Sequence, residues 1–73
     1  MADTGRLVEK KLFAGSRVRR LRREQRLTQA AMAEALGIST SYLNLIERDQ
    51  RPISAQILLQ LVDVFDIDPR GLA

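Results

Sequence analysis

Apolar residues recur every three or four positions through most of this chain, which is the spacing that puts side chains on one face of a helix. No stretch alternates apolar and polar residues in the way a half-buried strand does. The predicted fold is therefore all-α, a compact bundle of four helices with a short terminal turn that would make a fifth. The four predicted helices cover residues 13–26, 29–36, 40–47 and 55–65.

The two middle helices carry their own start and stop signals. Thr28 and Ser39 precede them, and each hydroxyl can accept a hydrogen bond from a first-turn N–H group. Gly37 suits the left-handed residue that often ends a helix. Ala33 provides a small side chain where two helices must cross closely, and the second helix turns inward the apolar residues at 43 and 46.

These features together form the helix-turn-helix pattern, a two-helix unit that lays its second helix in the major groove of DNA. The pattern combines a small residue, a turn glycine and apolar residues at positions 38, 43 and 46. The alternative interpretation is an ordinary helical hairpin inside some other all-helical domain, because fold and function are separable.

The first and last helices supply the rest of the predicted core. Ser54 is the expected N-cap of the last helix, and Asp66 is its expected end. Asp68 would cap a final turn that begins with Pro69. The inward positions are all apolar, and they are Ala14, Val18, Leu21, Leu27, Ile57, Leu58, Leu61, Val64 and Phe65, with Phe13, Ile67 and Leu72 at the edges.

Residues 1–12 are predicted to be a flexible arm, and residues 13–73 form the one domain that 73 residues allow. The arm has few apolar residues. Leu7 and Val8 could pack on the body or on a second subunit, and the basic residues of the arm could instead touch DNA.

Positive charge is concentrated in the first part of the chain. The net charge is only +3, but nine of the twelve Lys and Arg residues lie between Arg6 and Arg26, against the two acids Glu9 and Glu24. A basic face of this kind indicates an anionic partner, and nucleic acid is the leading candidate. Arginines on the first helix, among them Arg17, are candidate phosphate contacts, although a solvated helix face would look the same.

The residue types exclude several classes of function. Cysteine and histidine are both absent, so there is neither a disulfide framework nor the usual ligands of a transition metal. No nucleophile–base pair can be assembled, so neither an enzyme nor a cofactor site is predicted. No apolar run approaches the ~20 residues of a membrane span, and no signal peptide is recognisable, which makes the cytoplasm the expected compartment.

Arg22 lies at the edge of the apolar stripe on the first helix, so its side chain should be partly covered and should need a partner. Glu47, at the end of the predicted helix over residues 40–47, is the predicted partner. Such a pair would clamp the first helix to the recognition helix.

Taken together, the residues of the pattern that runs from Arg22 to Glu47 resemble the Xre or phage-repressor type of helix-turn-helix domain, which is a lambda-repressor-like fold. The segment SYLNLIERDQRPISAQILLQL further resembles the amino-terminal domain of bacterial regulators of short-chain fatty acid and acyl metabolism, which usually continue into a larger sensing region. This chain would then be a fragment or a stand-alone relative. The matching residues are Arg22, Leu27-Thr28-Gln29, Ala33, Leu36-Gly37, Ser39, Tyr42-Leu43 and Ile46-Glu47.

The resemblance implies a regulator that binds operator DNA as a symmetric dimer. Thr40, Ser41 and Leu45 would face base edges, with Asn44 nearby, because hydroxyls can donate or accept and apolar groups can meet the thymine methyl. The implied phosphate contacts are Gln29, Tyr42, Arg48 and Arg51, with core packing as the alternative role for Tyr42. A pair equivalent to Arg22–Glu47 also occurs in the family.

Two positions depart from the family pattern. Members often have glycine where Arg26 stands, and a left-handed arginine costs about 1 kcal/mol, so the turn there is expected to be built differently. Members also commonly have glycine near Asp49, and an acid close to the path of the DNA makes the loop contacts uncertain.

A protein-interaction or antitoxin-like module, using Leu7, Ile53 or Val62 to hold a partner, is the competing hypothesis.

Overall fold

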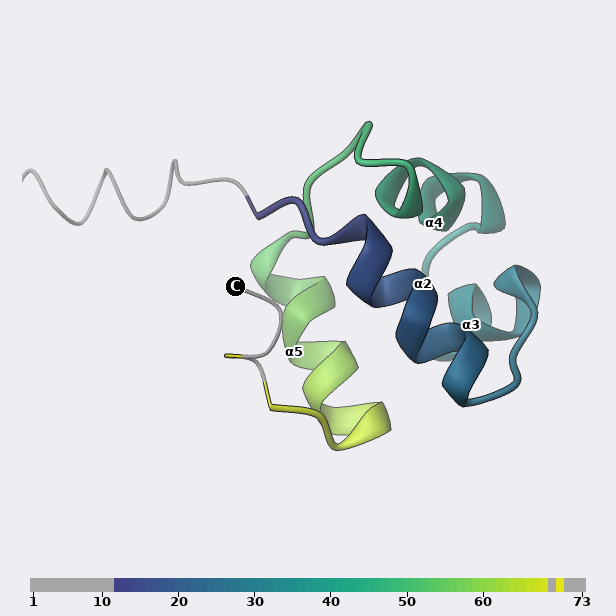
Figure 1. Cartoon of the computed structure of the whole chain (residues 1–73), viewed down its shortest axis with the longest axis vertical. Helices are drawn as coiled ribbons and strands as arrows, with labels where there is room; N and C mark the ends of the chain where they lie inside the picture. The colour runs from purple at the N-terminus through teal and green to yellow at the C-terminus, as the bar shows by residue number, and fades with distance from the viewer. Residues whose placement is uncertain (1–11, 69, 71–73) are drawn as a thin grey trace, which may run out of the picture.

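The computed structural model describes residues 12–68 and 70, and this part of the chain is a small helical bundle (Figure 1). It contains no strand beyond an isolated antiparallel bridge, in which the Ile53 N–H donates to the Leu12 carbonyl at 2.8 Å. The all-α prediction is therefore confirmed. The helices, labelled as in Figure 1, are α2 (Gly15–Glu24), α3 (Gln29–Leu36), α4 (Thr40–Glu47) and α5 (Ala55–Phe65).

Three of the four helices begin as the sequence predicts. The hydroxyls of Thr28, Ser39 and Ser54 each accept a hydrogen bond from the backbone N–H three residues later, at 3.0 to 3.2 Å. Each cap satisfies one of the N–H groups that the first helical turn leaves without a partner. Gly37 ends α3 in the left-handed region with φ 72°, which is also the predicted role.

Helix α2 is shorter than predicted, because it begins at Gly15 and ends at Glu24 rather than covering residues 13–26. Its N-cap, Ala14, has no side chain that can accept a hydrogen bond. The carboxylate of Asp49 takes that role from the loop after α4, since its Oδ1 accepts from the Gly15 N–H at 2.9 Å. The cap comes from 34 positions away, so local sequence patterns do not show it.

The turn after α2 contains the left-handed arginine that the sequence argued against. Arg26 has φ 57°, so it adopts the conformation that glycine would adopt. Its N–H donates to the Arg23 carbonyl and the next N–H donates to the Arg22 carbonyl, each at 3.0 Å. These bonds satisfy carbonyls at the end of the helix. The expectation of a differently built turn was wrong.

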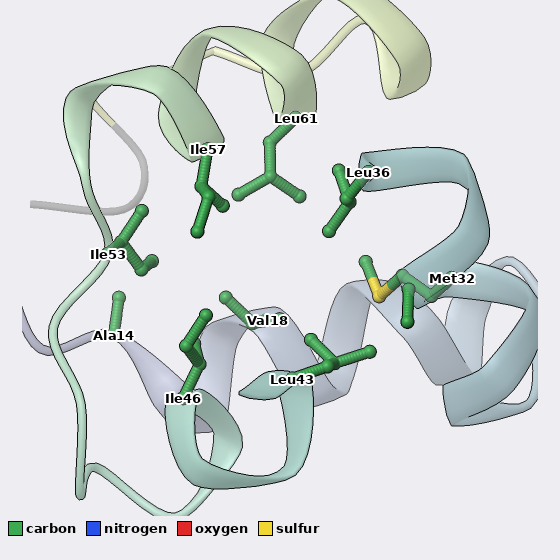
Figure 2. Close-up of a cluster of buried hydrophobic side chains, with 10 residues drawn as sticks. Ala14, Val18, Met32, Leu36, Leu43, Ile46, Ile53, Ile57 and Leu61 are labelled. Carbon is green, nitrogen blue, oxygen red and sulfur yellow. The ribbon is translucent and has the colours of Figure 1, made fainter. Parts of the chain in front are cut away.

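One apolar core lies between the four helices (Figure 2). Helix α3 packs against both α4 and α5, and α2 packs against α4. Ala33 is 1% exposed, in keeping with its predicted place at a close helix crossing. The largest fully buried side chains are Met32, Leu43, Ile46, Leu61 and Val18.

Two residues predicted in or beside the core are more exposed than expected. Val64 was expected to face inward but is 45% exposed, and Leu61 is the last residue of α5 in the buried cluster. Phe13, expected beside the core, is 50% exposed. Leu58, Phe65 and Ile67 are partly buried and pack against the core, as predicted.

Several expectations fall outside the described residues. They concern the arm up to residue 11, Pro69 and Leu72. Asp68, which is described, does accept the backbone N–H of Arg70 through its Oδ1 at 2.9 Å. Among the described residues, none of the helices has the length and apolar character that crossing a membrane requires.

Candidate nucleic-acid interface

Helix α4 has one buried face and one exposed face. Leu43, Ile46 and Glu47 are buried, whereas Thr40 and Ser41 in the first turn are exposed. Asn44 and Leu45 are half-buried between the two faces. The residues that the resemblance assigns to base contacts are thus away from the core, along one side of a short helix. Tyr42, assigned to a phosphate, is half-buried and packs partly against the core.

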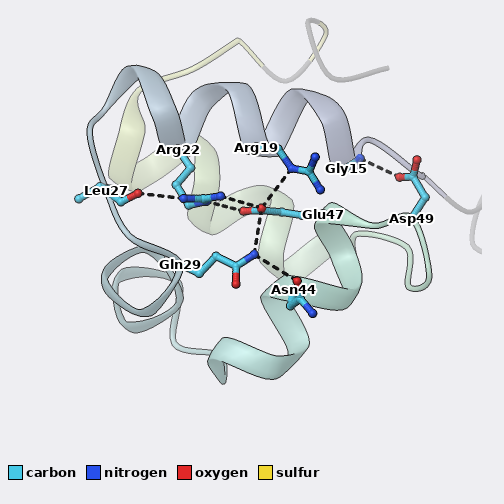
Figure 3. A network of polar contacts seen from close by, with 8 residues as sticks. All are labelled: Gly15, Arg19, Arg22, Leu27, Gln29, Asn44, Glu47 and Asp49. Carbon is cyan, nitrogen blue, oxygen red and sulfur yellow. Dashed lines mark hydrogen bonds and ion pairs between the residues drawn. The ribbon is translucent and has the colours of Figure 1, made fainter.

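The side chain of Glu47 is the buried charge that fixes this helix. Arg22 donates to it twice, from Nε to Oε2 at 2.7 Å and from Nη2 to Oε1 at 3.0 Å (Figure 3). Arg22 also donates from Nη1 to the Leu27 carbonyl at 3.1 Å, which ties the turn after α2 into the same group. Arg19 lies 3.6 Å from Oε1. The structure places Arg22 and Glu47 in contact, as the sequence predicts.

The contacts between the two side chains favour the charged form of each at neutral pH. Burial raises the pKa of Glu47, but hydrogen bonds from Arg22 and Gln29 and the nearby arginine charges lower it by more, so the pKa lies below its ordinary value. The hydrogen bond to Glu47 raises the pKa of Arg22 against the effect of burial. Within the described residues, every buried side-chain nitrogen and oxygen has a hydrogen-bond partner.

Gln29 extends the buried pair toward the exposed face of α4. Its Nε2 donates to Glu47 Oε1 at 3.1 Å and to Asn44 Oδ1 at 3.3 Å (Figure 3). Sequence reasoning named Gln29 and Asn44 separately and missed their contact. The only signal was the motif itself, which brings the start of α3 against the middle of α4.

The remaining phosphate candidates lie around this unit. Arg48 and Arg51 are exposed on the segment after α4, and Arg17 is exposed on α2. Asp49, in the same segment, was expected to lie close to the path of a phosphate. One oxygen of its carboxylate accepts from the Gly15 N–H, so Asp49 fixes the start of α2 against this loop.

The described residues form no cluster of metal ligands. In residues 12–68 and 70, no three His, Cys, Asp or Glu side chains are grouped so as to hold a metal ion. The chemistry on the exposed side of α4 is that of hydroxyl, amide and aliphatic groups, with guanidinium groups nearby. Such groups can bind polar edges, methyl groups and anions.

Comparison with known proteins gives the same picture. Residues 18–72 match the family model HTH_3, described as "Helix-turn-helix". The HTH-type transcriptional regulator PrpR of Mycobacterium tuberculosis is 56% identical over 55 residues, which make up 75% of this chain and 11% of that protein. The propionyl-CoA carboxylase regulator of Cereibacter sphaeroides is 47% identical over 58 residues, 80% of this chain and 13% of that protein. This chain thus spans only about a tenth of the length of these relatives.

A solved structure shares the fold. The P22 c2 repressor, crystallised in complex with a synthetic operator, superimposes with a TM-score of 0.74 at 27% identity, over 86% of this chain and 94% of the repressor chain. The residues that the family model matches include α3, the turn at Gly37 and α4. This chain belongs to the Xre-like helix-turn-helix family.

Proposed function

We propose that this chain is a sequence-specific DNA-binding domain of a transcriptional regulator, with α4 as the helix that enters the major groove. The observation that carries the proposal is the two-sided construction of α4: one side is fixed by the core and by Glu47, and the other presents Thr40 and Ser41 to solvent. A rigid helix with exposed polar residues in its first turn is what base reading requires. The relative PrpR supports the proposal, because it is named as an HTH-type transcriptional regulator.

The base contacts would come from Thr40, Ser41, Asn44 and Leu45. The two hydroxyls can donate or accept, the amide can do both, and the aliphatic side chain can meet the thymine methyl. None of these is a bidentate arginine, so direct readout is modest, and DNA shape contributes to specificity.

Phosphate contacts would come from the surrounding residues. Gln29 begins α3, where N–H groups without helical partners and the helix dipole both favour an anion. Guanidinium groups and the Tyr42 hydroxyl can bind further phosphates on either side of α4. The proposed set is Gln29, Tyr42, Arg48, Arg51 and Arg17.

The proposed binding unit is a homodimer on a pseudo-palindrome, whose half-sites are about 34 Å apart, one turn of DNA. The dimer contact would involve the carboxy-terminal residues Val62, Ile67 and Leu72, of which Leu72 lies outside the described residues. In a longer protein such as the relatives, a sensing region would follow this domain, and the whole would act in the bacterial cytoplasm.

The second candidate is a protein-interaction module of the same fold. The observation in its favour is the exposure of Leu59 (68%) and Val64 (45%) on α5. Ile53 was predicted as a residue that could contact a protein partner, but it is only 6% exposed and belongs to the core. This function would need neither the basic residues nor the exposed face of α4.

The test is selection from a pool of random duplexes, followed by titration of the enriched duplex at two salt concentrations. We expect a motif with two-fold symmetry, and an affinity that falls at least tenfold between ~50 and ~200 mM salt because binding releases counterions. A Leu59→Ala variant serves as control and should select the same motif. If nothing is enriched and any binding is insensitive to salt, the DNA-binding proposal is wrong and the α5 surface becomes the better candidate.

A further inference from the structure

The side-chain amide of Gln29 has only two N–H groups, and both point at protein atoms. The Gln29 Nε2 atom donates to Glu47 Oε1 at 3.1 Å and to Asn44 Oδ1 at 3.3 Å. The remaining Oε1 is an acceptor and cannot donate to a phosphate. A phosphate held by Gln29 would therefore bind the backbone N–H at the start of α3, and the side chain has a different role.

We infer that Gln29 is a positioning residue, which turns the Asn44 amide so that its nitrogen faces the DNA and makes Asn44 prefer guanine to adenine. This inference rests on the proposed function. Figure 3 shows the geometry: the Asn44 oxygen points toward Gln29 and its nitrogen points away from Gln29.

The preference follows from the donors and acceptors on the base edges. An asparagine that is free to turn usually reads adenine, because its oxygen accepts from N6 while its nitrogen donates to N7. Here the oxygen is directed back to the protein, so the outward group is an NH₂ donor. Guanine presents two acceptors in the major groove, N7 and O6, whereas cytosine presents only a donor. Asn44 should favour guanine and reject cytosine.

Gln29 can hold this orientation because it is itself held. Its partner Glu47 has a side chain with no exposed surface, and Arg22 fixes both carboxylate oxygens at 2.7 and 3.0 Å. A chain of hydrogen bonds thus runs from the buried ion pair through Gln29 to the half-buried Asn44. Such chains restrict rotation at each step, which is what a specificity-determining side chain needs.

The experiment compares motifs selected from random duplexes by the wild type and by the variants Asn44→Ala, Gln29→Met and Asn44→Asp. The base pair at which Asn44→Ala loses preference is the pair that Asn44 reads. At that pair the wild type should enrich guanine over adenine by about tenfold. Methionine fills the volume of Gln29 without donating a hydrogen bond, so Gln29→Met should reduce that ratio toward one, or below one.

Asn44→Asp sharpens the test, because a carboxylate is acceptor-only and should move the preference at the same pair from guanine to cytosine. Gln56→Ala, which removes an exposed amide on α5, is the control and should leave the motif unchanged. Circular dichroism should show that each variant folds. If the wild type enriches a motif in which Asn44 reads adenine, or if Gln29→Met leaves the guanine preference intact, the inference is wrong and the DNA-binding function stands. If the wild type enriches no motif, the inference and the DNA-binding function both fail.

Discussion

The guanidinium of Arg22 and the carboxylate of Glu47 meet through two hydrogen bonds of 2.7 and 3.0 Å, which join α2 to the last residue of α4. The Glu47 side chain has no exposed surface, and that of Arg22 is 16% exposed. A pair so enclosed holds the two helices in one arrangement, because water cannot take the place of either side chain as the hydrogen-bond partner of the other. The orientation of the exposed face of α4 therefore depends on a contact inside the domain.

Removing one partner should be far more damaging than removing both. Arg22→Ala leaves the Glu47 carboxylate buried with only Gln29 and Arg19 nearby, and should lower the free energy of unfolding by about 3–5 kcal/mol. The double variant Arg22→Met/Glu47→Leu replaces the pair with apolar groups of similar size and should recover most of that loss. Urea unfolding measures both. A double variant no more stable than Arg22→Ala would contradict this account of the pair.

The pair should also make stability depend on pH in the acid range. The pKa of Glu47 is lower in the folded state, so the pair stabilises fully above the ordinary value near 4.5. This stabilisation is lost as the pH falls through the lowered pKa. Urea midpoints measured from pH 7 to pH 3 should therefore fall below about pH 4.5.

A matched pair of variants isolates the Glu47 contribution. Asp68 also has a lowered pKa, from its hydrogen bonds with Arg70, but it is exposed. Asp68→Asn should leave most of the acid slope, whereas Glu47→Gln should flatten it. The opposite ranking would show that Glu47 is not the main titrating group.

Gly15 should tolerate no side chain. A Cβ there would lie 2.5 Å from the carbonyl oxygens of Ile46 and Glu47 and 2.7 Å from Asp49 Oδ1. Two of these atoms belong to the backbone of α4 and cannot move without moving the helix, so Gly15→Ala should cost about 3 kcal/mol. Gly37→Ala is the comparison: its Cβ would enter open space, so only the left-handed φ costs, at about 1 kcal/mol. Equal losses in thermal unfolding would mean that α2 and α4 are not in close contact at Gly15.

Arg26 should be a site where glycine stabilises. Its φ of 57° is strained for an arginine, and its side chain is exposed. Arg26→Gly should raise the free energy of unfolding by up to about 1 kcal/mol, because relief of the strain outweighs the added freedom of the unfolded chain. Asp49 also has a left-handed φ of 59°, but Asp49→Gly removes the cap on α2 and should destabilise. If Asp49→Gly raises the urea midpoint or leaves it unchanged, the role of Asp49 as a cap is wrong; if Arg26→Gly lowers the midpoint, the strain assigned to Arg26 is wrong.

The features that the sequence predicts well are those set by neighbouring residues. Thr28, Ser39 and Ser54 cap helices through the N–H three positions later, and Gly37 ends α3 because its own conformation allows it. These outcomes depend on local chemistry, so a reading of adjacent residues finds them. The Arg22–Glu47 contact was also predictable, because a charged residue beside an apolar stripe must find a buried partner.

The features that the sequence hides depend on distant residues. Asp49 caps α2 from 34 positions away, and Gln29 reaches Asn44 across 15 positions. Neither pair has a local pattern that marks it. Arg26 is a different case: the intrinsic preference of arginine argues against a left-handed turn, and the hydrogen bonds at the end of α2 override that preference.

The most direct test of the central claim, that α4 reads bases, is a ratio of two affinities. The dissociation constant is measured for the selected duplex and for the same duplex with its bases shuffled. We predict that the shuffled duplex binds the wild type about 1,000-fold more weakly. Thr40→Ala should reduce this ratio by about tenfold, whereas Arg48→Ala should weaken both duplexes alike and leave the ratio unchanged. A wild-type ratio near one, or a ratio that Thr40→Ala does not change while Arg48→Ala does, would contradict the claim.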